Sequence, residues 1–115
     1  MTDASIFTRI YRGEIPGDIV AETERVFAIR DIDPQAPVHL LVIPKDETYR
    51  DVTELASGDP ALLAEMVSLA KRLADEEANG EYRLIFNNGA SAAQSVFHVH
   101  AHVLANIEEN KLVGF

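Results

Sequence analysis

Three histidines alternate with apolar residues near the end of the chain, in the segment 94–104. Alternation of this kind predicts a β-strand, because a strand sends residues i, i+2 and i+4 to the same face. His98, His100 and His102 then share one face at intervals of roughly 6.5–7 Å, and the intervening apolar side chains face a core. The chain has four histidines, and the fourth, His39, lies in another strand-like segment, 38–43. A sheet that pairs the two segments would gather all four into one site.

The composition predicts a single domain over residues 1–115 and excludes several classes of function. Hydrophobic residues make up 47% and charged residues 25%, as in soluble globular proteins. A net charge of −9 opposes general binding to nucleic acid or to an anionic membrane. No apolar run approaches the ~20 residues that cross a bilayer, and the first residues lack signal-peptide features. We therefore expect a cytoplasmic protein. The absence of cysteine excludes disulfides, thiolate catalysis and cysteine-based zinc sites.

Capping and turn residues divide the chain into strands and helices. Ser5 is a plausible N-cap for a short amphipathic helix over 5–12, and Asp59 with Pro60 opens one long helix that ends near Gly80. Short links join the first three strand-like segments, which indicates antiparallel pairing. The prediction is an α+β fold with a five-stranded antiparallel sheet, one long helix and one short N-terminal helix. The five segments with strand patterns are 19–22, 25–31, 38–43, 82–87 and 94–104.

Three titratable rings on one face are hard to explain by packing alone, and two chemical interpretations remain open. In the first, the histidines hold a metal ion, although rings at successive same-face positions lie parallel instead of converging on one ion. In the second, a neutral imidazole attacks phosphorus as a nucleophile while its neighbours bind phosphate oxygens. The loop before the strand, with Ser95, would then supply hydrogen-bond donors. This second interpretation uses all four histidines and requires no cofactor and no metal.

The segment 98–104 matches the signature of the histidine triad (HIT) family, His-x-His-x-His followed by two apolar residues. Further blocks resemble the Hint branch of that family, the purine nucleoside phosphoramidases, and occur in the same order. The resemblance implies a HIT-like fold and a homodimer whose two sheets run together. It also implies cleavage of the P–N bond in an AMP-type purine nucleotide, such as adenosine phosphoramidate or an adenylated lysine. The matching blocks are 5–7, 13–16, 31–39, 42–45, 87–89 and 94–96.

The resemblance also implies roles for individual residues. His100 would be the nucleophile that carries the nucleotidyl group, and His98 would hold it through its backbone carbonyl. His102 would contact the phosphate, His39 would extend the proton network, and Ser95 would assist the leaving amine. The substrate would be surrounded by phosphate-loop positions Asn87, Ala93 and Gln94, by Asp31 at the ribose, and by Ile6, Phe7, Ile32 and Leu41 at the base.

Some positions depart from the Hint pattern. Ala92 and Ala93 stand where Hint proteins commonly have glycines, and a positive φ there would strain an alanine. Ile29 and Arg30 stand where an aromatic and a polar residue often line the base pocket. Two other functions therefore stay open beside metal binding. One is hydrolysis of dinucleoside polyphosphates by the same triad, and the other is nucleotide binding or scaffolding without turnover.

Overall fold

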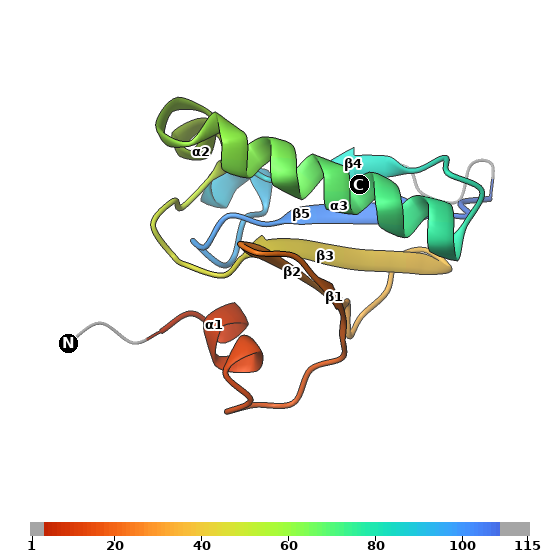
Figure 1. The fold of residues 1–115 in the computed structure, drawn as a ribbon, viewed down its shortest axis with the longest axis horizontal. Coiled ribbons are helices and arrows are strands. Elements are labelled where there is room, and N and C mark those ends of the chain that lie inside the picture. Colours follow the sequence, from red (N-terminus) through yellow and green to blue (C-terminus); the bar gives the residue numbers. More distant parts are fainter. Residues whose placement is uncertain (1–3, 109–115) are drawn as a thin grey trace.

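The structure, a computed structural model, describes residues 4–108 as one five-stranded sheet with helices on both faces (Figure 1). All neighbouring strands are antiparallel, in the order β1-β2-β3-β5-β4. The α+β fold and the five-stranded antiparallel sheet expected from the sequence are confirmed. The strands are β1 (Ile19–Glu22), β2 (Val26–Arg30), β3 (Val38–Pro44), β4 (Arg83–Ile85) and β5 (Ala101–Ala105).

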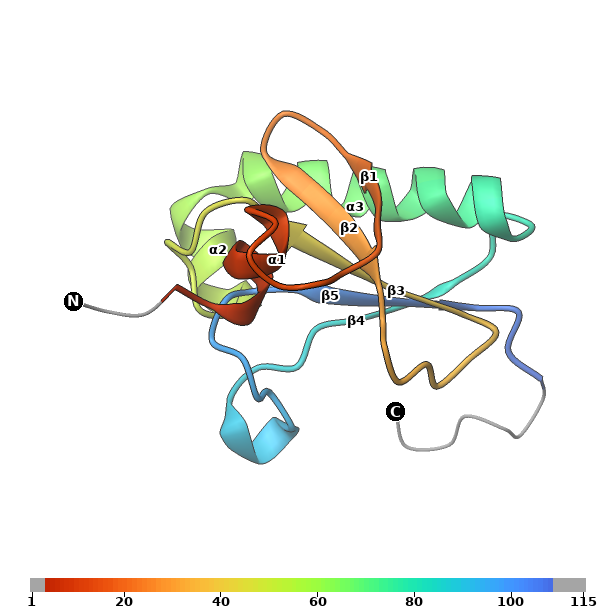
Figure 2. The same ribbon diagram turned by 90° about the horizontal axis from the view of Figure 1, so that it is seen from below.

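The helices are α1 (Ile6–Tyr11), α2 (Val52–Gly58) and α3 (Pro60–Glu77). α3 crosses one face of the sheet, and α1 lies against the other face (Figures 1 and 2). Both predicted N-caps are present, because Ser5 accepts a hydrogen bond from the Thr8 N–H and Asp59 accepts one from the Leu62 N–H. No helix among residues 4–108 is long and apolar enough to cross a bilayer.

The period-two alternation of the strands separates two apolar clusters, one on each face of the sheet. On the face covered by α3, the helix buries Leu62, Met66, Leu69 and Leu73 against strand residues that include Val26, Leu40, Val42 and Val103. On the face covered by α1, the buried cluster consists of Phe7, Phe27, Ile29, Leu41 and Ile43. Because Leu41 pairs directly with His102 across β3 and β5, the histidines lie on the α1 face.

Two predicted strands are shorter in the structure than the sequence pattern indicated. β4 covers only 83–85 of the predicted 82–87, and the single strand predicted over 94–104 is wrong in its first half, since β5 begins at Ala101. The backbone of 98–100 bonds with the loop after β3 instead of a strand, and the Val99 N–H donates to the Tyr49 carbonyl. His98 and His100 therefore precede the strand that carries His102.

One helix was not predicted. α2 begins after Asp51, whose side chain accepts from the Glu54 N–H, while the Glu54 carboxylate accepts from the Arg50 N–H. An acidic N-cap followed three residues later by glutamate resembles a capping box, and this was a readable signal for a helix start. The helix is only one residue from α3, because Asp59 both ends α2 and caps α3.

Candidate active site

The four histidines come from three places in the fold and meet on the α1 face of the sheet. His39 in β3 and His102 in β5 lie on neighbouring strands, paired with Leu104 and Leu41 respectively. The His39 and His102 ring centroids are 5.2 Å apart, and those of His100 and His102 are 5.4 Å apart. His98, His39 and His100 are 0%, 5% and 9% exposed, so these rings are in an environment nearly free of water.

Backbone carbonyls fix the protonated nitrogen of two rings. Carbonyl oxygens only accept hydrogen bonds, so the His98 Nε2, 2.7 Å from the Pro44 oxygen, must carry a proton. The neutral ring then has an unprotonated Nδ1, which accepts from the Ser5 hydroxyl at 2.6 Å. By the same reasoning, the His100 Nδ1 donates to the His98 carbonyl at 2.8 Å. The His100 Nε2 is therefore left with a lone pair, as a nucleophile requires.

A backbone amide fixes the other two rings in the same way. The Gln35 N–H donates to the His39 Nδ1 at 3.0 Å, so the proton of neutral His39 is on Nε2. This Nε2–H donates to the His102 Nδ1 at 2.9 Å, and the proton of neutral His102 must then be on its own Nε2. The site thus presents one nitrogen lone pair, from His100, beside a ring nitrogen that carries a proton, from His102.

Burial keeps all four rings neutral near pH 7. Loss of hydration disfavours the imidazolium form and is the largest cause of a lowered pKa at His39, His98, His100 and His102. For His102 the nearby His100 and His39 rings add to this effect, and its pKa falls from 6.5 to about 4. A neutral His100 can act as a nucleophile at physiological pH without first losing a proton.

We expect the free energy of unfolding to decrease as the pH falls below about 6.5. Between that pH and the lower pKa values of the native rings, the unfolded chain binds more protons than the folded chain, so acid favours unfolding. Urea denaturation at pH 7.5, 6.5 and 5.5 would measure this. The carboxylates of Glu22, Glu47 and Asp59, with ordinary pKa values of 4.5, 4.5 and 3.8 that are lowered here, contribute only at lower pH. His102→Asn should make the dependence smaller, because the other three rings still contribute. An unchanged wild-type midpoint from pH 7.5 to 5.5 would contradict the prediction.

Three of the predicted substrate-binding residues lie against the histidines. Phe7 contacts His98 and His100, with ring centroids 5.8 and 4.8 Å apart, and packs in the same cluster as Leu41. An oxygen of Asp31 lies 3.4 Å from the His39 Nε2. Ile6 is half exposed and Ile32 is 97% exposed, so a wall for a base at these two positions stays a prediction.

Arg30 points away from the histidines. Its guanidinium bonds with Glu77 of α3 at 2.8 Å and lies 3.3 Å from an Asp18 oxygen, which places it on the face covered by α3. The neighbouring Ile29 is buried in the cluster on the α1 face. Of the two departures from the Hint pattern in β2, only Ile29 can change the shape of the site.

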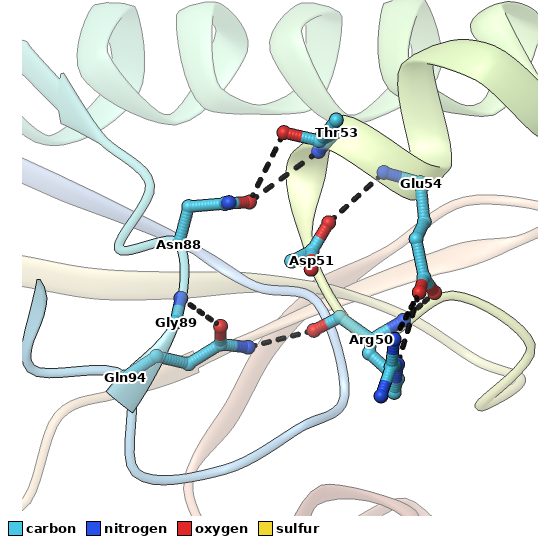
Figure 3. Close-up of polar contacts among 7 residues, drawn as sticks. All are labelled: Arg50, Asp51, Thr53, Glu54, Asn88, Gly89 and Gln94. Atoms are coloured by element: carbon cyan, nitrogen blue, oxygen red, sulfur yellow. Dashed lines mark hydrogen bonds and ion pairs between the residues drawn. The ribbon is translucent and has the colours of Figure 1, made fainter. Parts of the chain in front are cut away.

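Gln94 holds the loop between β4 and β5 in place (Figure 3). Its Oε1 accepts from the Gly89 N–H, and its Nε2 donates to the carbonyls of Arg50 and Val96 at 2.6 and 3.0 Å. The side-chain amide is used within the chain, so in this geometry it supports the loop between β4 and β5, and a direct contact with phosphate stays a prediction. The Asn88 side chain accepts from the backbone and hydroxyl of Thr53 and ties the same loop to α2 (Figure 3).

Ser95 and Ala93 are exposed on this loop, and the half-buried Asn87 follows β4. Ala93 has a φ of 70° and lies in the left-handed region, where a side chain costs roughly 1 kcal/mol. Ala92 has no such conformation. The departure from glycine therefore strains the backbone at Ala93 and not at Ala92.

Comparison with known proteins places this chain in a family. The HIT domain family matches residues 12–109, which is most of the chain. The chain belongs to the HIT domain family. It is 40% identical over 106 residues to the purine nucleoside phosphoramidase of Escherichia coli K12, covering 90% of this chain and 88% of that protein. It is also 40% identical over 110 residues to the 14 kDa zinc-binding protein of Zea mays, covering 92% and 84%.

A solved HIT structure has the same fold. The HIT family hydrolase from Clostridium thermocellum superposes with a TM-score of 0.87 at 36% sequence identity, covering 98% of this chain and 99% of that one. The resemblance to the HIT family that the sequence indicated is thus confirmed. α2, which the sequence reading omitted, belongs to the structure described here beside the two expected helices.

Asp31, His39 and His102 are the described residues that approach a metal-binding arrangement in this HIT domain. One ligand atom from each lies within 4.8 Å of the other two. The His39 Nε2 and the His102 Nδ1, however, are only 2.9 Å apart and are joined by a hydrogen bond. Two nitrogens bound tetrahedrally to zinc at 2.0–2.1 Å would be about 3.3 Å apart. The present geometry fits a hydrogen-bond relay better, and a metal ion could enter only by breaking it.

Sequence reasoning missed three contributors to the site. The Gln35 N–H fixes the His39 ring, the Pro44 carbonyl fixes the His98 ring, and Ser5 donates to His98 in addition to capping α1. Two of these groups are backbone atoms, which carry no residue-specific signal. Ser5 was recognised only as a cap.

Proposed function

We propose that this HIT protein is a nucleotide hydrolase that cleaves the P–N bond of purine nucleoside phosphoramidates through a nucleotidyl-histidine intermediate. The observation that carries the proposal is the pair of fixed rings, in which the His100 Nε2 has a lone pair and the adjacent His102 has a protonated Nε2. The name of the Escherichia coli relative, purine nucleoside phosphoramidase, supports the same substrate class.

In the proposed reaction the His100 Nε2 attacks the α-phosphorus, a P–N bond forms to the ring, and the bond to the leaving amine breaks. The departing nitrogen takes a proton from the Ser95 hydroxyl and leaves as the amine. Water then attacks the phosphorus and gives a proton back to the Ser95 oxygen, the His100 nitrogen leaves, and a nucleoside monophosphate is released. During both steps the His102 Nε2–H bonds a phosphate oxygen, where negative charge develops.

The surrounding residues act on the same intermediate. His98 fixes the His100 ring through its carbonyl, so the lone pair stays directed at phosphorus. His39 and Asp31 support His102. The His39 Nε2–H donates to the His102 Nδ1, and the nearby Asp31 carboxylate stabilises this N–H group. In the proposal Asp31 also binds the ribose hydroxyls, Asn87, Ala93 and Gln94 form the phosphate loop, and Ile6, Phe7, Ile32 and Leu41 surround the base.

A direct test compares two substrates, each with and without a chelator. The protein is incubated with an adenosine phosphoramidate and, separately, with a dinucleoside polyphosphate. We expect faster turnover of the phosphoramidate and no loss after exhaustive chelation, because the nucleophile and its donors use the nitrogens that a metal would need. Faster turnover of the polyphosphate would assign the chain to the sister activity. Activity lost on chelation and restored by zinc would favour the metal interpretation, and no turnover of either substrate would favour a binding or scaffold protein.

We also propose a homodimer in the cytoplasm. β4 pairs only with β5 within the described chain and so presents an unpaired strand edge, which proteins usually cover. Leu63 is half-buried and Val67 is 37% exposed on α3, so part of its apolar stripe also lacks cover. Light scattering at micromolar concentration should give twice the 12.7 kDa of one chain. A mass near that of a single chain would contradict the dimer.

A further inference from the structure

A surface carboxylate joins the first turn of α1 to the loop after β3. The Glu47 Oε1 accepts a hydrogen bond from the Ser5 N–H and another from the Thr8 hydroxyl, the latter at 2.5 Å. These partners are 42 and 39 residues away in the sequence, so the contact exists only in the folded chain. The hydrogen bond from Thr8 is the main cause of a lowered pKa at Glu47, which is therefore a carboxylate at neutral pH.

The same turn of α1 contacts two members of the histidine triad. The Ser5 hydroxyl donates to the His98 Nδ1 at 2.6 Å, and the Thr8 N–H donates back to that hydroxyl oxygen at 3.2 Å. Phe7 lies between these residues and packs edge-on against the His98 and His100 rings. His98 in turn accepts the His100 Nδ1–H on its carbonyl. A continuous series of contacts therefore runs from Glu47 through the first turn of α1 to His98, and from His98 to the His100 Nδ1. The hydrogen bond at that Nδ1 orients the His100 ring and the lone pair on its Nε2.

We propose that Glu47 is a positioning residue, which acts through Ser5 and Thr8 to hold the His98 and His100 rings in the geometry for attack on phosphorus. Ser5 would have two tasks, because its hydroxyl both caps α1 and fixes His98, and Glu47 holds Ser5 where both are possible. The kinetic consequence rests on the proposed phosphoramidase function, but the effect on the rings does not.

The location of Glu47 makes the proposal testable. Its side chain is exposed, so truncation leaves no buried cavity and the fold should survive. Glu14 provides a matched control, because it also pairs with residues in and next to α1, Arg9 at 3.8 Å and Arg12 at 3.7 Å, without touching the Ser5–His98 hydrogen bond. Glu14→Gln removes one carboxylate charge beside α1, as Glu47→Gln does.

The experiment compares wild type, Glu47→Ala, Glu47→Gln, Thr8→Val and Glu14→Gln at neutral pH. Two readouts are taken: kcat and KM for an adenosine phosphoramidate, and the ¹⁵N and N–H resonances of the His98 and His100 rings without substrate. In Glu47→Ala we expect kcat to fall about tenfold, less than the ~10²-fold loss of a 1 Å misplacement, with a smaller change in KM. The His98 Nδ1 resonance should shift toward that of an imine nitrogen without a donor, and the His100 Nδ1–H should exchange faster with solvent.

The other variants separate positioning from simple loss of stability. Glu47→Gln keeps an acceptor oxygen and should recover most of the kcat, Thr8→Val should resemble a milder Glu47→Ala, and Glu14→Gln should match wild type. A folded Glu47→Ala protein with wild-type kcat and unchanged ring resonances would overturn the proposal, as would equal effects in Glu14→Gln. If wild type fails to hydrolyse the phosphoramidate, the proposed function is wrong, and the ring resonances alone then decide the role of Glu47.

Discussion

His100→Ala should reduce hydrolysis of an adenosine phosphoramidate by on the order of 10⁴-fold or more, as in other enzymes that lose a covalent nucleophile. The His98 carbonyl accepts the proton on the His100 Nδ1, so the lone pair of the His100 ring is on its Nε2. This Nε2 is the nitrogen that attacks phosphorus in the proposed reaction, and the variant lacks it. Turnover measured at saturating substrate gives the size of the loss. The affinity for AMP, measured by calorimetry, should change much less, because Phe7, Leu41 and Asp31 are still present to bind the nucleoside.

Mass spectrometry distinguishes loss of the nucleophile from a collapsed site. Wild type quenched during turnover should carry one nucleotidyl adduct, and His100→Ala should carry none. The ring is 9% exposed and packs on Phe7, so thermal unfolding of the variant should be recorded beside its activity. A folded variant that keeps more than a few per cent of the wild-type rate, or an adduct on another residue, would remove His100 from the role of nucleophile.

Ser95→Ala should slow cleavage of an amine leaving group by about 10²-fold, the usual size of general-acid assistance. Nitrogen departs poorly as an anion and needs a proton, whereas fluoride departs as a stable anion and needs none. The variant should therefore hydrolyse an adenosine 5′-phosphorofluoridate at nearly the wild-type rate. The chain is held on both sides of Ser95, since the Gln94 side chain is anchored to Gly89 and Arg50 and also bonds the Val96 carbonyl.

A matched control for this prediction is available in the same loop. Ser91 is exposed on the short 3₁₀ turn Ala90–Ala92, and Ser91→Ala should leave both rates unchanged. Equal losses on the amine and fluoride substrates in Ser95→Ala would mean that Ser95 positions the phosphate instead of assisting the leaving group. That result would leave the nucleophile at His100 untouched.

Local patterns were sufficient to predict much of the fold. The caps at Ser5 and Asp59 and the apolar stripe of α3 depend on neighbours within one or two turns, and each is present in the structure. The same holds for the strand parity that puts His39 and His102 on one face. The pattern failed over 94–100, because alternation describes an extended chain whether or not its backbone pairs with a strand. There the backbone bonds the loop after β3.

The sequence by itself was enough to single out the four histidines as one candidate site and Ser95 as a predicted member of it, because residue type and spacing are local properties. Only the tertiary structure decided which nitrogen carries the proton in the His98 and His102 rings. Those protons depend on the Pro44 carbonyl, 54 residues from His98, and on the His39 ring, 63 residues from His102. Such partners meet only when the chain folds back on itself. A hydrogen bond is decided by the separation of atoms in space, and residue spacing along the chain does not contain that information.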